Sequence, residues 1–256
     1  MLLAQQALPT GEAAEASVNL FTIIADWFTG FIGGLWRELY HNFLVDDRYI
    51  GYLKGLGVTM QVSLFAALLG IVLGTVLALM RLSKNKFLSR LAGAYIALIR
   101  GTPLLLQVLI FNFGIFGKVR IDKSLVGIIA CGVNSSAYVA EIIRGGILSV
   151  DRGQSEAGRS LGLSGGQTMV FIVFPQALKA ALPAMCNEFI VLIKETSVLA
   201  YIALTDLTKA ADYVRSRTFS PFTPYIIAAI FYLIVITVLT FLLRKLEERL
   251  RQGDRH

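Results

Sequence analysis

Five long apolar stretches constrain this chain of 256 residues more than any other feature of its sequence. They lie at about residues 56–80, 91–116, 125–147, 182–204 and 224–243. A helix that crosses a bilayer needs about 20 mostly apolar residues, and each stretch meets that length. We therefore predict an all-α membrane protein with five transmembrane helices.

The composition supports this class and argues against nucleic-acid binding. Hydrophobic residues make up 55% of the chain and charged residues 16%, which lies outside the range of soluble domains. The formal charge of +7 is divided among loops, without a basic stripe interleaved with aromatic residues. Cys131 and Cys186 fall inside predicted spans, so they are interpreted as packing residues.

The first 52 residues are predicted to form an extracytoplasmic or interfacial segment. Residues 1–9 lack the basic start and the apolar length of a signal peptide. Residues 18–36 are apolar but contain Asp26, so an interfacial helix is favoured over a sixth span, which stays open as the alternative. Its aromatic residues suit the headgroup level: Trp27, Phe28, Phe31 and Trp36.

Basic residues set the orientation of the predicted spans. Thirteen basic residues fall on one side of the membrane. Four of them stand in the loop after the first span: Arg81, Lys84, Lys86 and Arg90. The other side receives nine basic residues with nine acidic ones beside them. Because cytoplasmic loops carry an excess of Lys and Arg, we predict the N-terminus outside and the C-terminus inside. A transmembrane domain at 53–248 is then followed by a cytoplasmic tail at 249–256.

Small residues recur every fourth position along the first span, at Ala66, Gly70, Gly74 and Ala78. Such a stripe lets another helix approach closely, since packing drives helix association in lipid. We interpret the stripe as part of the bundle, with no role in binding a substrate.

The loop at 151–175, on the predicted cytoplasmic side, is rich in small residues that are compatible with a helix. Asp151 is predicted to cap a helix start, with Gln154 as its capping-box partner. Gly162 is predicted to end the helix. A slim helix parallel to the membrane surface is a shape that fits a groove on a partner protein.

Polar residues inside the third span share one helix face. Asn134, Tyr138 and Glu141 are spaced four and three apart. Ionisable residues inside spans are costly and are candidates for a substrate path. For Glu141 the alternative is an ion pair with Arg144.

The second and fourth spans also carry residues that lipid disfavours. Pro103 interrupts the second span and leaves the carbonyl of Ile99 without its helical donor. Arg100 lies at this break, where snorkelling to the interface is its alternative, and Gln107 lies one turn further on. In the fourth span, Glu188 and Glu195 share a face, and Lys194 is a possible neutralising partner.

Four segments occur in order along these spans, and together they resemble the permease subunits of polar amino-acid ABC importers. They read RGTPL at 100–104, AYVAEIIRGG at 137–146, GQSEA at 153–157 and KETS at 194–197. The resemblance covers about residues 50–248. It implies the type I importer membrane domain, with five transmembrane helices, an N-terminal interfacial helix and a cytoplasmic coupling helix.

The resemblance also implies the partners and the roles of named residues. It implies a dimer with itself or a sister permease, cytoplasmic ATP-binding subunits and an extracytoplasmic solute-binding protein, in a bacterial inner membrane. ATP and Mg are then used by the ATPase, and this chain is expected to be no enzyme and to bind no cofactor or metal. The ATPase-coupling residues would be Glu156, Ala157, Gly158, Gly162 and Pro175. Candidates for the amino-acid path are Arg100, Gln107, Asn134, Tyr138, Glu141 and Glu195.

The sequence departs from the family pattern at two positions. Gly158 replaces the usual second Ala, which is expected to loosen the coupling helix by about 1 kcal/mol. Phe174 replaces the usual Leu before Pro175 and keeps an apolar anchor.

Two other classes of function are weighed against the importer. In an ion-coupled secondary transporter, Glu141, Glu195 and Lys194 would form an ion relay, but the repeated broken spans of that class are not visible. A membrane-embedded enzyme finds little support, because His41 and His256 lie outside the spans and no nucleophile–base pair is apparent.

Overall fold

The computed structural model describes residues 22, 23, 25, 29, 30 and 33–252, and every regular element in them is a helix. Residues 33–43 are helical and lead into the short η1 (Val45–Asp47). The elements that follow are α2 (Arg48–Leu82), α3 (Lys86–Arg100), α4 (Leu104–Leu109), η2 (Ile110–Ile115), α5 (Lys123–Ser149), α6 (Arg152–Ser160), α7 (Gly165–Thr168), η3 (Met169–Val173), α8 (Phe174–Glu195), η4 (Thr196–Ile202), α9 (Leu207–Thr218) and α10 (Thr223–Gln252).

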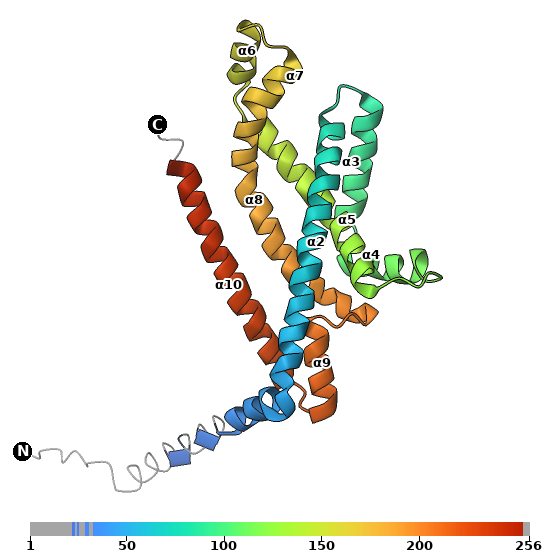
Figure 1. Ribbon diagram of the computed structural model, residues 1–256, viewed down its shortest axis with the longest axis vertical. Coiled ribbons are helices and arrows are strands. Elements are labelled where there is room, and N and C mark those ends of the chain that lie inside the picture. Colours follow the sequence, from blue (N-terminus) through green and yellow to red (C-terminus); the bar gives the residue numbers. More distant parts are fainter. Residues whose placement is uncertain (1–21, 24, 26–28, 31–32, 253–256) are drawn as a thin grey trace, which may run out of the picture.

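The long helices run between two ends of an elongated bundle (Figure 1). Helices α6 and α7 and the turn between α2 and α3 lie at one end, which we call the α6 end. Helix α9 and the starts of α2 and α10 lie at the other, which we call the α9 end. Helices α2, α5 and α8 form the packed centre, while α10 leans away from them toward the α6 end.

The small-residue stripe of α2 packs against α5, as the sequence predicts. Ala66, Gly70, Gly74 and Ala78 are all buried. A Cβ atom added at Gly74 would lie 2.8 Å from the side chain of Val139, so only a glycine allows the two helices to approach this closely. Cys131 is buried in the same core.

The second apolar stretch is a broken helix. Helix α3 ends at Arg100, and α4 with η2 leaves it at a bend of 101°. Gly101, Thr102 and Pro103 form the bend, and all three are exposed. Pro103 lacks the N–H group that would continue the helix, which is the physical reason for the break.

Among the described residues, four continuous helices are long and apolar enough to cross a membrane, and the bent pair raises the number to five if it counts as one span. The fourth of these segments is helical from Gly165 to Ile202, so it starts well before the span expected at 182–204. Pro175 does not interrupt it and stands in the first turn of α8, directly after the π-helical turn of η3. Helix α10 continues to Gln252.

The predicted interfacial helix at 18–36 is described only in part. Trp27, Phe28 and Phe31 lie outside the described residues. Trp36 is described and is 67% exposed. It lines an apolar groove between its own helix, with Tyr40, and α10, with Phe231.

Candidate coupling helix and translocation path

Helix α6 begins with a side-chain cap, as predicted. The carboxylate Oδ1 of Asp151 accepts a hydrogen bond from the N–H of Gly153 at 2.6 Å. The reciprocal bond predicted from Gln154 is wrong, because Gln154 Oε1 accepts from Gln176 Nε2 at 3.4 Å instead. The capping box of this loop is built at the start of the next helix, α7, by Ser164 and Gln167.

Gly162 terminates α6, as predicted, in a Schellman turn that follows the last helical residue, Ser160. Gly162 has a φ of +85°, a conformation that favours glycine. Its N–H donates to the carbonyl of Arg159 at 3.0 Å, and the N–H of Leu163 donates to the carbonyl of Gly158 at 3.1 Å. These two bonds satisfy carbonyls that the end of a helix otherwise leaves open.

Gly158 has a packing role that the sequence does not reveal. It is the one buried residue of α6, and a Cβ atom there would lie 2.7 Å from Ile172 Cδ1 and 2.9 Å from Thr168 Cγ2. The missing side chain therefore lets α6 rest on α7 and η3. This close contact offsets the cost in helix propensity that was expected for a glycine at this position.

The other predicted coupling residues are exposed: Glu156, Ala157, Gly162 and Pro175. Beside them stands Leu161, which the sequence did not single out and whose side chain is 82% exposed. Helix α6 thus presents a polar and small-residue surface with one projecting apolar side chain.

At the broken second span, Gln107 repairs the backbone that Pro103 leaves open. Its Nε2 donates to the freed carbonyl of Ile99 at 2.8 Å and to Thr102 Oγ1 at 2.8 Å. Its Oε1 accepts from Asn134 Nδ2 at 3.0 Å. Gln107 and Asn134 are 6% and 3% exposed, so in this conformation their amides bind each other and the backbone.

The path candidates Arg100, Tyr138 and Glu141 form two contacts with side chains of α5. The guanidinium carbon of Arg100 stands 5.2 Å from the centre of the Tyr138 ring, a cation–π contact across the bend. Glu141 forms an ion pair with Arg144 at 2.6 Å, the alternative that the spacing left open. Arg100 is exposed, so it remains accessible to a solute.

The two glutamates of α8 occupy the same face, and neither forms an ion pair with Lys194 within the described residues. Glu188 accepts a hydrogen bond from Ser135 Oγ at 3.1 Å and lines an apolar cavity of about 380 Å³ among α2, α5, α8 and α10. Glu195 is half-buried and Lys194 is exposed. The described residues contain no group of three or more His, Cys, Asp or Glu side chains that fits a metal ion.

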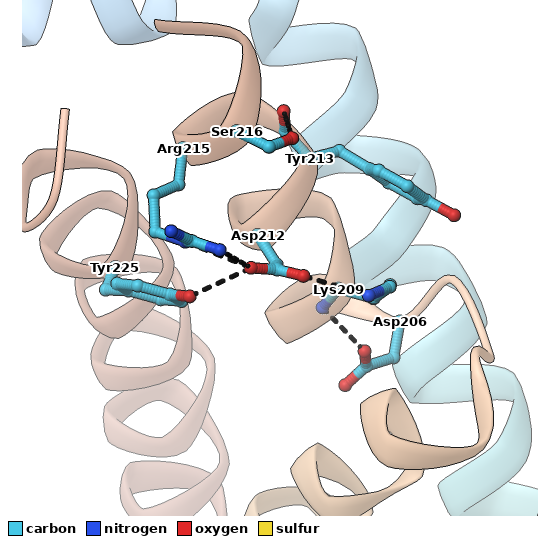
Figure 2. Close-up of polar contacts among 7 residues, drawn as sticks. All are labelled: Asp206, Lys209, Asp212, Tyr213, Arg215, Ser216 and Tyr225. Carbon is cyan, nitrogen blue, oxygen red and sulfur yellow. Dashed lines mark hydrogen bonds and ion pairs between the residues drawn. The ribbon is translucent and has the colours of Figure 1, made fainter. Parts of the chain in front are cut away.

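Sequence reasoning missed a charged cluster on α9, which joins this helix to α10 (Figure 2). Asp212 accepts from Lys209 Nζ at 2.8 Å, from Arg215 Nη2 at 2.8 Å and from Tyr225 hydroxyl at 3.1 Å. Hydrogen bonds from Lys209 and Arg215 lower the pKa of Asp212 to about 2. The spacing of charges at 209, 212 and 215 is the signal that points to one helix face.

Asp206 starts the same helix from a buried position. Its Oδ1 accepts from the N–H of Lys209 at 2.8 Å, which caps α9. Its side chain is fully buried, and its Oδ2 has no hydrogen-bond partner in the described part of the chain. Burial raises the pKa of this carboxyl to about 6.

Comparison with known proteins places this architecture among transport proteins. The family model described as "binding-protein-dependent transport system inner membrane component" matches residues 70–252. The arginine transport system permease protein ArtQ of Bacillus subtilis is 37% identical over 79% of this chain and 93% of its own length. The probable glutamine ABC transporter permease protein GlnM of the same organism is 39% identical over 82% of this chain and 98% of its own length.

Solved structures give the same result for the fold. A crystal structure described as an amino acid ABC transporter with histidines has a TM-score of 0.74 and 42% identity, over 78% of this chain and 94% of that one. An inward-facing MetNI methionine ABC transporter has a TM-score of 0.70 over 81% of this chain and 99% of that one. Its identity is 17%, so it supports the fold alone.

Proposed function

Since the chain belongs to the family of binding-protein-dependent transport system inner membrane components, we propose that it is the permease subunit of an ATP-driven importer for a polar amino acid. The observation that carries this function is the match, over about four-fifths of the chain, to permeases named for arginine and glutamine. The chain itself is a transporter subunit rather than an enzyme. ATP and Mg are used by separate ATP-binding subunits, and this chain binds no cofactor of its own.

The α6 end faces the cytoplasm and α6 docks on the ATPase. The exposed positions Glu156, Ala157 and Leu161 supply the contact surface, and Gly158 and Gly162 fix the position and the end of the helix. When the ATP-binding subunits close, α6 is displaced with them, and the packed helices switch between outward-open and inward-open arrangements. The surplus of basic residues in the loops of this end supports that orientation, with the N-terminus outside.

A second permease, either another copy of this chain or a sister chain, completes the pathway. The apolar cavity among α2, α5, α8 and α10 and the exposed bend at Gly101 to Pro103 are consistent with a bundle that is open on one side. The amino acid passes between the two permeases and reaches the polar residues of the broken span.

Within this path, Arg100 binds the carboxylate of the amino acid and Glu141 or Glu195 binds its ammonium group. The exposed guanidinium of Arg100, at the bend and beside Tyr138, supports the first assignment. Gln107 and Asn134 stabilise the bent backbone of the second span, since their amides bind one another and the carbonyl of Ile99.

The test is uptake of labelled arginine, glutamine and histidine into proteoliposomes that contain the permease and its ATPase. We expect uptake that requires ATP and a loaded binding protein, and that falls at least tenfold in Arg100→Gln. The matched variants Glu141→Gln and Glu195→Gln test the ammonium site. If both leave uptake and substrate-stimulated ATP hydrolysis unchanged, that site is wrong. Uptake driven by an ion gradient without ATP would instead support a secondary transporter and contradict the function itself.

A further inference from the structure

The turn between α2 and α3 is strongly basic and lies at the α6 end (Figure 1). Its cations are all exposed: Arg81, Lys84, Lys86 and Arg90. The sequence holds no Asp or Glu from residue 48 to residue 121, so no acidic residue interrupts this positive charge along the chain. We call Lys84, Lys86 and Arg90 the basic turn.

The backbone of this turn is fixed by hydrogen bonds that leave the three cations of the basic turn unused. Arg81 Nη1 donates to Ser89 Oγ at 3.1 Å, and Ser89 Oγ donates to the carbonyl of Arg81 at 3.0 Å. Asn85 Oδ1 accepts from the N–H of Phe87 at 2.9 Å and so caps α3. In the part of the chain that the structure describes, no ion pair holds Lys84, Lys86 or Arg90.

The described acidic residues of the α6 end belong to other elements. Glu141 on α5 is paired with Arg144. The others lie at α6 or on α10: Asp151, Glu156, Glu247 and Glu248. Helix α3 packs against α2 and α5, and Figure 1 shows α6 and the end of α10 apart from the turn. The positive charge of the basic turn therefore faces outward without a neighbouring carboxylate to neutralise it.

An apolar face of α3 continues from the basic turn. Phe87, Leu91 and Leu98 are 71%, 51% and 64% exposed, and their spacings of four and seven place them on one side of the helix. The opposite side packs against α2 and α5. The helix rises about 16 Å from Phe87 to Leu98, close to the ~15 Å of hydrocarbon in one leaflet of a bilayer. Cations at the top and an apolar face below match the two parts of a phospholipid.

We propose that the basic turn binds the phosphate of an anionic phospholipid in the inner leaflet, with the acyl chains of the lipid along Phe87, Leu91 and Leu98. This inference rests on the proposed function, which places the α6 end at the cytoplasm. Each Lys or Arg near the membrane surface strengthens the attraction of anionic lipid about fivefold.

Two further arguments favour a lipid as the occupant. Lys86 opens α3, where the helix dipole disfavours a cation, and a bound anion offsets both positive charges. A cytoplasmic protein would contact the basic turn alone, whereas the apolar face below it extends into the depth of the bilayer. A phospholipid occupies both surfaces with one molecule.

The test places a photoreactive side chain in the site, as Phe87→p-benzoylphenylalanine, in the full permease–ATPase complex. The complex is put into nanodiscs with equal amounts of phosphatidylglycerol and phosphatidylcholine, and mass spectrometry identifies the cross-linked lipid. We expect phosphatidylglycerol to exceed phosphatidylcholine at least tenfold. The added changes Lys84→Gln, Lys86→Gln and Arg90→Gln should lower this ratio to near one. Lys86→Gln alone should lower it about fivefold, which keeps the test decisive if the triple variant does not assemble.

Two control variants separate the site from total charge. The exchange Lys84→Arg, Lys86→Arg and Arg90→Lys keeps the charge of the basic turn and should keep the ratio. The matched control removes three exposed cations from the end of α10 on the same side of the membrane and should leave the ratio within about twofold. Its changes are Arg244→Gln, Lys245→Gln and Arg249→Gln.

A ratio that falls only when the basic turn is neutralised, with ATPase co-purification at the wild-type level, supports the proposal. A ratio near one before neutralisation overturns it, and so does an equal fall in the α10 control. Cross-linking to the ATP-binding subunit or to a second permease in place of lipid also overturns it and assigns the turn to that protein. The lipid is identified without ATP or amino acid, so ATP-driven uptake by the wild type tests the proposed function separately.

Discussion

Helix α6 at one end of the bundle and helix α9 at the other are both short, with nine and twelve residues, but different kinds of contact hold them. Helix α6 is held by caps within its own loop and by the contact of Gly158 with Thr168 and Ile172. Helix α9 buries a row of side chains against α2 and α10 and is capped by a buried carboxylate.

The difference indicates how each helix can work. A helix whose contacts lie within its own loop can move as a unit with a partner while the bundle stays packed. A helix that shares its core with two long helices passes a displacement directly to them. We therefore expect substitutions in α6 to change coupling more than stability, and substitutions in the buried face of α9 to change stability first.

Two leucines give the largest expected contrast. Leu207 on α9 is fully buried, and Leu207→Ala should destabilise the protein by about 2–5 kcal/mol, because it leaves a cavity in the core. Leu161 at the end of α6 is 82% exposed, and Leu161→Ala should change stability by less than about 0.5 kcal/mol. Thermal unfolding of the two variants in detergent measures both. Equal losses would contradict the distinction between the two ends.

A side chain larger than methyl at Gly158 should break coupling. Gly158→Leu overfills the contact with Ile172 and Thr168, at a cost of about 1–3 kcal/mol, and displaces α6. We expect ATP-driven uptake to fall at least tenfold. Binding-protein affinity at the α9 end should stay at the wild-type level.

Gly158→Ala is the matched control for this prediction. The added methyl group would stand 2.7 Å from the flexible end of Ile172, which can rotate away, and 2.9 Å from Thr168 Cγ2, which a small shift of α6 relieves. Uptake should therefore remain within about twofold of the wild type. A similar loss in both variants would show that the position needs glycine for its backbone and not for its size.

A smaller effect is expected from the buried cap of α9. The pKa of Asp206 is raised from 3.8 to about 6 by burial, so the folded protein keeps a proton that the unfolded chain has released. Stability should therefore rise as the pH falls through 6, with the gain complete near pH 4. Between pH 7.5 and 5 this corresponds to about 1 kcal/mol, or about 2–4 °C in melting temperature.

Asp206→Asn isolates that contribution, because it keeps an oxygen to accept the bond from the N–H of Lys209 but cannot titrate. The pH-dependent gain should be smaller in the variant than in the wild type. Identical pH dependence in the two proteins would assign the effect to other groups. Asp212 contributes nothing in this range, since its pKa of about 2 keeps it ionised.

The sequence predicts those parts of the structure that follow from local chemistry. The cap at Asp151, the turn at Gly162 and the break at Pro103 depend on single residues with strong backbone preferences, and all three are present. The stripe from Ala66 to Ala78 is also buried as predicted, because its period matches one helix face.

Other features depend on contacts that sequence spacing does not specify. Gln107 is a candidate for the substrate path from its position alone, and the sequence does not indicate that its amide binds the carbonyl of Ile99 eight residues earlier. Apolar stretches of membrane length do not reveal an amphipathic helix of twelve residues such as α9. Helix propensity alone does not reveal the role of Gly158, which depends on its contact with Ile172 in η3.

Cross-linking from each end tests most directly that α6 binds the ATPase while α9 faces the binding protein. Leu161→Cys and Ser216→Cys each place a thiol at an exposed position, one at each end. In the assembled transporter we expect position 161 to cross-link to the ATP-binding subunit and position 216 to the binding protein. Cross-linking of the ATPase from position 216, or none from position 161 while ATP-driven uptake persists, would contradict the account.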